Sequence, residues 1–114
     1  MALKGSSIAL YRGIPAHYVS LDTYKNYEHY YWTSFTSTSR NRKVAEVFAG
    51  KGGIIFKIFI GQNKPYTNII LPNSWSNAPE EEEVLLFPNF CFAVISKKKT
   101  PDGFTEVMVA EVPY

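Results

Sequence analysis

Four consecutive glutamates, residues 80–83, stand directly before the apolar run Val-Leu-Leu-Phe of residues 84–87. If residues 84–87 form a strand whose extended backbone begins slightly earlier, side chains two apart share a face, about 6–7 Å along the strand. Glu81 and Glu83 then point to the same side, where carboxylates can deprotonate a nucleophile or stabilise developing positive charge. The glutamates by themselves favour a simpler interpretation, a solvated turn that leads into a buried strand.

Two other stretches place polar groups at the end of an expected strand. Arg12 follows the strand-like run of residues 8–11, and an arginine there can clamp a phosphate or a carboxylate through two hydrogen bonds. Gly13, directly after it, lets a ligand approach the backbone closely. A Ser-Thr-Ser triplet at residues 37–39 ends another strand just before a predicted helix. The alternative interpretations are an ordinary surface arginine, and a helix cap with β-favouring threonines.

The elements that must position these groups are mainly strands, because most of the chain alternates with period two. About six strands are expected. Strand-like segments lie at residues 7–13, 29–35 (overlapping with 34–39), 52–61, 84–87, 90–97 and 104–112. Loops are expected at residues 13–20, 61–68 and 72–80, a turn at 97–103, and a weak helical turn from Ser20. The sequence therefore predicts a β-dominated α+β domain.

One clear helix interrupts the strands. Ser39 is a suitable N-cap for it. Val44, Val47 and Phe48 follow at helical spacing, and Gly50 is a typical stop signal.

Composition limits the function further. At 114 residues the chain is long enough for one domain, and its net charge of +2 indicates neither a nucleic-acid nor a membrane partner. Cys91 is the only cysteine, so an internal disulfide is excluded, and it is expected to be a small buried apolar residue. Two histidines and one cysteine do not make a zinc site, so no metal is expected. Without a signal peptide or an apolar run of roughly 20 residues, a soluble chain in a reducing compartment is expected, with a cytoplasmic or unknown location. A monomer is expected as well.

Taken together, Arg12, the triplet at residues 37–39 and the pair Glu81 and Glu83 resemble the arginine–serine–glutamate class of mono-ADP-ribosyltransferases. The flanking residues agree: Tyr-Arg-Gly surrounds the arginine, a phenylalanine precedes the triplet by two positions, and the glutamates continue into Val-Leu-Leu-Phe-Pro. A Phe-Ala-Val run at residues 92–94 also fits. The resemblance extends from about residue 8 to the C-terminus. It implies one catalytic domain over residues 1–114, with two small, roughly perpendicular β-sheets around an NAD cleft and one principal helix.

The resemblance assigns residues to NAD binding. Arg12 would bind the pyrophosphate, and Gly13 would present backbone groups to the nicotinamide carboxamide. Ser37 would hold the wall of the active site close to the catalytic glutamate. Phe48 would pack against the nicotinamide ring, or be a core residue of its helix.

The resemblance also assigns the catalytic groups. Glu83 would bond the 2′-hydroxyl of the nicotinamide ribose and stabilise the oxocarbenium charge that develops as nicotinamide leaves. Glu81 would orient or deprotonate the acceptor, and a glutamate at this position goes with arginine as acceptor in this family. Residues 72–80, with Trp75 at the tip of the loop, correspond to the target-recognition loop.

The expected activity is transfer of ADP-ribose from NAD to an arginine-containing protein or a small guanidino compound. Two alternatives remain open: an NAD glycohydrolase on the same fold, and a catalytically silent binding module. Many relatives carry a helical segment ahead of the strand that holds the arginine, whereas Arg12 follows only eleven residues here. The chain is therefore expected to be a minimal member or a domain from a longer protein.

Overall fold

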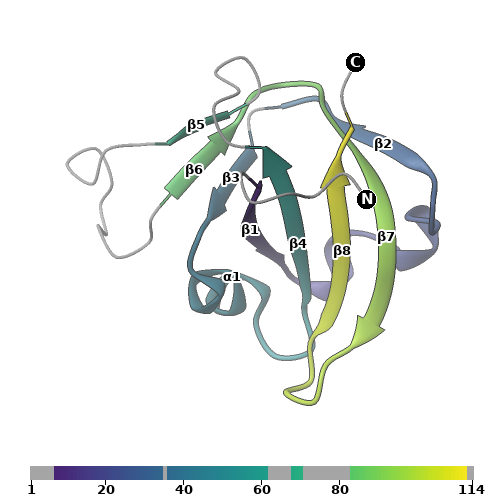
Figure 1. Cartoon of the computed structure of the whole chain (residues 1–114). Helices are drawn as coiled ribbons and strands as arrows, with labels where there is room; N and C mark the ends of the chain where they lie inside the picture. The colour runs from purple at the N-terminus through teal and green to yellow at the C-terminus, as the bar shows by residue number, and fades with distance from the viewer. Residues whose placement is uncertain (1–6, 35, 62–67, 71–82, 113–114) are drawn as a thin grey trace.

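The computed structural model describes residues 7–34, 36–61, 68–70 and 83–112. Within these residues the chain forms one α-helix, α1, over Arg42–Ala49, and two short 3-10 helices, Ala16–Tyr18 and Leu21–Thr23. The strands are β1 (Ser7–Ile14), β2 (His29–Trp32), β3 (Thr36–Ser39), β4 (Ile54–Gly61), β5 (Asn68–Ile70), β6 (Glu83–Leu86), β7 (Phe90–Lys99) and β8 (Thr105–Glu111). The predicted β-dominated α+β class is confirmed (Figure 1).

The strands lie in the order β2-β7-β8-β4-β1-β3-β6-β5. Strands β1 and β4 share eight residue pairs, whereas β1 and β3 share the single pair of Tyr11 with Ser39. This junction divides the strands into a group of five, β2-β7-β8-β4-β1, and a group of three, β3-β6-β5. The described strands form one continuous eight-stranded sheet, and the two expected sheets correspond to these two groups within it. Figure 1 shows β5 and β6 running across the direction of β4 and β8.

Several local predictions need correction. Strand β5 was not expected, and β1 continues through Ile14 into the segment expected to be a loop.

The helical turn at Ser20 is confirmed, because the Ser20 side chain accepts a hydrogen bond from the backbone N–H of Asp22. The turn before β8 is confirmed as well, closed by a backbone hydrogen bond from Gly103 to Thr100. The expected loop at residues 72–80 lies outside the described residues.

The main core is rich in aromatic side chains. Phe56, Phe90 and Phe92 are buried between the strands, and Trp32 packs against them, with its ring centroid 4.4 Å from that of Phe92. Tyr24 closes the cluster, with its ring 5.4 Å from that of Phe56. These large rings fill the space that the curved sheet encloses, so the stability of this core depends on the volume of its aromatic side chains.

Helix α1 packs on the opposite face of β1 through small residues. Ala45 and Ala49 are its buried residues, and they lie with Ile55 in a second, smaller core cluster. Two of the residues noted at helical spacing lie outside this buried face, since Val47 is 80% exposed and Phe48 is 62% exposed. The alternative that Phe48 is a core residue of its helix is therefore wrong. Only alanines fit here, because the helix backbone lies directly against the sheet.

The start of α1 also differs from the prediction. Its N-cap is Asn41, whose side chain accepts a hydrogen bond from the backbone N–H of Lys43. Ser39 is still part of β3, where it pairs with Tyr11 and Glu83, and its hydroxyl accepts from the backbone N–H of Asn41. The strand pairing holds Ser39 two residues too early to cap the helix.

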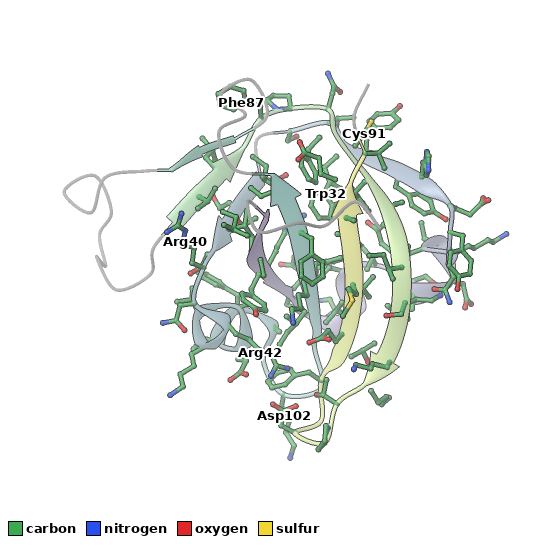
Figure 2. The ribbon with its side chains drawn as sticks, viewed as in Figure 1. Trp32, Arg40, Arg42, Phe87, Cys91 and Asp102 are labelled. Atoms are coloured by element: carbon green, nitrogen blue, oxygen red, sulfur yellow. The ribbon has the colours of Figure 1, made fainter. Side chains whose placement is uncertain are left out.

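Ion pairs join α1 to the turn between β7 and β8. The Arg42 guanidinium lies 3.6 Å from Glu46, 3.7 Å from Asp102 and 4.0 Å from Glu106. Figure 2 shows Arg42 and Asp102 near the same end of the molecule. Arg42, Glu46 and Asp102 are partly exposed, so the pairs of Arg42 with Glu46 and Asp102 each contribute little to stability by themselves.

The remaining observations concern predictions made from composition. Cys91 is half-buried in β7, opposite Tyr31 of β2, rather than fully buried as expected. In the part of the chain that the structure describes, no group of histidine, cysteine or acidic residues is arranged to hold a metal ion. Over those same residues, no helix has the length and apolar character needed to cross a membrane.

Candidate active site

A cavity of about 310 Å³ lies where β1, β3 and α1 meet. Its lining contains four of the residues that the sequence singled out, Arg12, Gly13, Ser37 and Phe48. The other lining residues are Tyr11, Thr38, Ser39, Val44 and Ala45. The volume is at the lower end of the range for small-molecule sites, so the cavity can hold part of a nucleotide.

Arg12 is a lining residue of this cavity, and among the described residues it has no carboxylate partner. It lies half-buried on β1, and the ion pairs of the described residues involve Arg42 and not Arg12. Burial lowers the pKa of the Arg12 guanidinium from its ordinary value, and the nearby Tyr24 side chain acts in the opposite direction. An arginine remains protonated at neutral pH all the same. A half-buried guanidinium that has no carboxylate partner in the described part of the chain is suited to binding an anion.

Gly13 is required where it is because α1 approaches β1 so closely. A Cβ atom placed on Gly13 would lie 1.8 Å from the carbonyl oxygen of Ala45 and 2.9 Å from the backbone nitrogen of Ala49. Gly53 has the same role before β4, where an added Cβ would lie 2.2 Å from the carbonyl oxygen of Ala49. The sequence offered ligand approach as the reason for the glycine. The structure adds helix packing as a second reason, and this packing sets the position of one wall of the cavity.

The three residues of the hydroxyl triplet in β3 differ in exposure. Ser37 is exposed toward the cavity, while Thr38 is buried and donates a hydrogen bond of 2.7 Å to the carbonyl oxygen of Val84. Ser39 is also buried. The residues of the triplet therefore have different roles. Thr38 joins β3 to β6, and Ser37 is available at the cavity.

The backbone register brings Glu83 next to this triplet. Glu83 is the first residue of β6, and it pairs with Ser39, a lining residue of the cavity. A strand start at this position agrees with the expectation that the last glutamate of the run directly precedes the apolar strand. Glu81 and Trp75 lie outside the described residues.

Phe48 lies at the rim of the cavity. Its side chain is 62% exposed, so it is not a core residue of α1. Its position next to Val44 makes this part of the cavity apolar. An exposed ring at the edge of a pocket is suited to packing against a flat ligand.

Two residues next to Arg12, neither of which lines the cavity, were missed by sequence reasoning. The Arg12 guanidinium carbon lies 5.0 Å from the centroid of the Trp32 ring, and the Trp32 indole N–H donates to the Tyr24 hydroxyl at 3.4 Å. Trp32 lies within the fold (Figure 2). The aromatic run at residues 29–32 was visible in the sequence, but nothing in it indicated that its last ring would face Arg12.

No protein-family model matches this sequence, and a comparison with curated proteins finds no match. Solved structures do match it. Exoenzyme S from Pseudomonas aeruginosa, in a complex that also contains carba-NAD, matches with a TM-score of 0.72 and 20% identity over 96% of this chain. The Vis toxin, an ADP-ribosyltransferase from Vibrio splendidus, matches with a TM-score of 0.67 and 22% identity over 94%. The C3 exoenzyme of Clostridium limosum matches with a TM-score of 0.73 and 16% identity over 97%.

This chain spans only part of these proteins, covering 50%, 49% and 62% of their respective chains. The match includes both strand groups, because nearly the whole of this chain is aligned. The identities are too low to carry an activity from one protein to another. What the comparisons establish is that this chain has the fold of the bacterial ADP-ribosyltransferases.

Proposed function

We propose that this protein is a mono-ADP-ribosyltransferase that moves ADP-ribose from NAD to a guanidino acceptor and releases nicotinamide. The acceptor would be arginine in a protein or a small guanidino compound. The observation that carries the proposal is the convergence of Arg12, Gly13, Ser37 and Phe48 in one cavity. These residues come from three different elements and are the ones that the resemblance assigned to NAD.

Each group suits one part of NAD. Arg12, a cation without a carboxylate partner among the described residues, suits the pyrophosphate. The exposed Phe48 ring suits the nicotinamide, and the backbone at Gly13 suits its carboxamide. Support comes from two solved structures of the same fold: exoenzyme S contains carba-NAD, and a C3 enzyme from S. aureus contains NAD.

The chemistry follows from the charges. The bond between C1′ of the ribose and the nicotinamide nitrogen breaks, so that neutral nicotinamide leaves and positive charge develops on the ribose. Glu83, paired in register with Ser39 at the cavity, would stabilise this charge through the 2′-hydroxyl. A guanidino nitrogen then attacks C1′, and Glu81 would accept the proton that it loses. The products are ADP-ribosyl-guanidine and nicotinamide.

The arginine specificity rests on Glu81 and on one comparison. A guanidinium is almost fully protonated in water, so an acceptor of this kind needs a carboxylate base beside it. A structure of the Vis enzyme contains agmatine, a guanidino compound. This observation makes agmatine a suitable first acceptor for the present protein.

The direct test is to incubate the protein with NAD, with and without agmatine, and to measure nicotinamide and ADP-ribosyl-agmatine. We expect agmatine-dependent adduct in the wild type and loss of the adduct in both Glu83→Gln and Glu81→Gln. The loss in Glu83→Gln should be at least about 100-fold, as for other groups that stabilise transition-state charge. Glu28→Gln, on an exposed residue before β2, is the matched control and should keep wild-type activity.

Other results would contradict the proposal. Nicotinamide with free ADP-ribose, no adduct and no sensitivity to Glu81→Gln would identify an NAD glycohydrolase. If folded protein binds NAD without turnover, the domain is a binding module.

A further inference from the structure

The only aromatic ring that faces the Arg12 guanidinium among the described residues is Trp32, and it comes from a distant strand. Arg12 lies on β1, whereas Trp32 ends β2, and three strands separate β1 from β2 in the sheet order. The 5.0 Å approach of the guanidinium carbon to the indole centroid is therefore made across the interior of the curved sheet. On β1, Arg12 lies two residues from both Leu10 and Ile14, which belong to the main core. Residues two apart in a strand share a face, so Arg12 points toward the aromatic cluster.

Trp32 is itself firmly held. Its ring packs at 4.4 Å from Phe92, 5.3 Å from Phe56 and 6.2 Å from Phe90. The indole N–H is satisfied by the Tyr24 hydroxyl at 3.4 Å, and Tyr24 is buried. A ring with contacts on several sides and its one donor bonded has little freedom to rotate. It can therefore act as a rigid platform for a side chain that lies over it.

An aromatic platform differs from a carboxylate partner in one respect that matters for anion binding. A carboxylate would neutralise the guanidinium and occupy the N–H groups that an anion needs. An aromatic face attracts the cation through its quadrupole and leaves the N–H groups free to donate.

We propose that Trp32 is a positioning residue for Arg12, holding its guanidinium by cation–π contact so that the N–H groups are ready to bind the pyrophosphate of the dinucleotide. This inference rests on the proposed function, since it concerns the same cavity. It adds a residue that the motif-based assignment did not include. Trp32 acts through Arg12 and does not touch the reacting atoms, so its loss should weaken binding and spare the chemical step.

Kinetics with NAD and agmatine provide the first test. We expect Trp32→Leu to raise the KM for NAD about tenfold with little change in kcat, because the cation is still present but no longer oriented. Trp32→Phe keeps an aromatic face and should stay within about threefold of the wild type. Phe90→Leu is the matched control: Phe90 packs on the same indole, while the ring that faces Arg12 is that of Trp32. It should lower stability and leave the KM unchanged.

Fluorescence provides a second test that needs no turnover. The chain has two tryptophans, so Trp75→Phe leaves Trp32 as the only one. In that background we expect ADP, which supplies the diphosphate, to change the Trp32 emission, and adenosine, which lacks phosphate, to leave it unchanged. Arg12→Met should shift the emission without any ligand and abolish the response to ADP.

The outcomes separate this inference from the proposed function. If NAD is not turned over but ADP changes Trp32 emission only when Arg12 is present, the transferase proposal fails and the positioning role stands. If Trp32→Leu folds, as judged by circular dichroism, and binds ADP as tightly as the wild type, the positioning role is overturned. It is also overturned if Arg12→Met leaves the Trp32 emission unchanged, a measurement that does not depend on whether Trp32→Leu folds.

Discussion

The two faces of β1 are packed in opposite ways. On one face, Leu10, Arg12 and Ile14 point to a core of large aromatic rings. On the other face, Gly13 lies against the backbone of α1, with alanines as the buried helix residues. Large side chains fill the core on the first face. On the second face, small residues let α1 pack closely against β1. The candidate site includes residues from both faces. The aromatic face holds the Arg12 guanidinium through Trp32, and the close packing of α1 on Gly13 sets the position of the wall formed by the helix.

This comparison predicts that shortening a side chain lowers the stability of the protein most on the aromatic face. Phe92→Ala should lower the free energy of unfolding by about 3–5 kcal/mol, because it leaves a cavity beneath Trp32 and Tyr24. Urea denaturation measures the change. Tyr31→Ala, at a ring that is 61% exposed on β2, is the control and should change stability by less than about 1 kcal/mol. Equal effects of the two truncations would mean that the aromatic cluster does not carry the core.

On the helix face, adding side-chain volume should instead be the change that lowers stability. Gly13→Ala should cost about 3 kcal/mol and displace α1, because the new Cβ would meet the Ala45 carbonyl oxygen at 1.8 Å. Hydrogen exchange of the α1 amides, together with urea denaturation, measures both effects. Gly50→Ala separates packing from backbone strain, since Gly50 has a φ of +69° but open space around it. Its ψ of 177° adds to the strain, so the substitution should cost about 1–3 kcal/mol but leave α1 in place. Displacement of α1 in Gly50→Ala would contradict the packing argument.

Between these faces, Arg12 should lower the stability of the free protein. Arg12→Met removes a half-buried charge that has no carboxylate partner among the described residues, and should raise the free energy of unfolding by about 1 kcal/mol. Thermal denaturation without ligand measures the gain, and ADP binding should be lost in the same variant. Lys57→Met is the matched control, because Lys57 lies over Phe59 at 5.5 Å elsewhere on the sheet. It should stay within about 0.5 kcal/mol of the wild type, and a loss of stability in Arg12→Met would contradict the cost assigned to its charge.

The smallest effect is expected at the ion pairs that join α1 to the β7–β8 turn. The pKa of Asp102 is lowered from its ordinary value of 3.8, mainly by a hydrogen bond from the Thr100 hydroxyl and to a smaller extent by Arg42. Because the lowered pKa belongs to the folded state, the stabilisation is present above pH 4 and is lost as the pH falls through the lowered value. NMR titration should show the Asp102 pKa rising in Thr100→Val. If that variant also loosened α1, close packing at Gly13 would not be what holds the helix.

Sequence reasoning predicted most of the strands because their alternation is local. Residues 54–60 and 90–97 repeat at period two, and both lie within observed strands. It missed β5, which has three residues and pairs only with β6. It also misplaced the N-cap of α1, since the pairing of Ser39 with Tyr11 and Glu83 involves residues far away in sequence.

The sequence did not show that Ala45 and Ala49 are the buried residues of α1, for a related reason. Helical spacing identifies apolar positions, but it does not show how near the helix lies to its neighbour. Once the helix backbone rests on Gly13, alanines fit the interface and Phe48 is turned out to the cavity rim. An apolar residue at a helical period therefore served the site rather than the core.

For the candidate site, the sequence by itself determined which chemical groups are available: the cation at Arg12, the hydroxyls of residues 37–39 and the carboxylates before residue 84. It also placed each of them at the end of a strand, because such ends are marked by local changes of pattern. Only the tertiary structure decided that Arg12, Ser37 and Phe48 line one cavity, and that Trp32 faces Arg12. Those relations depend on the strand order and on the curvature of the sheet, which bring together residues that no local pattern connects.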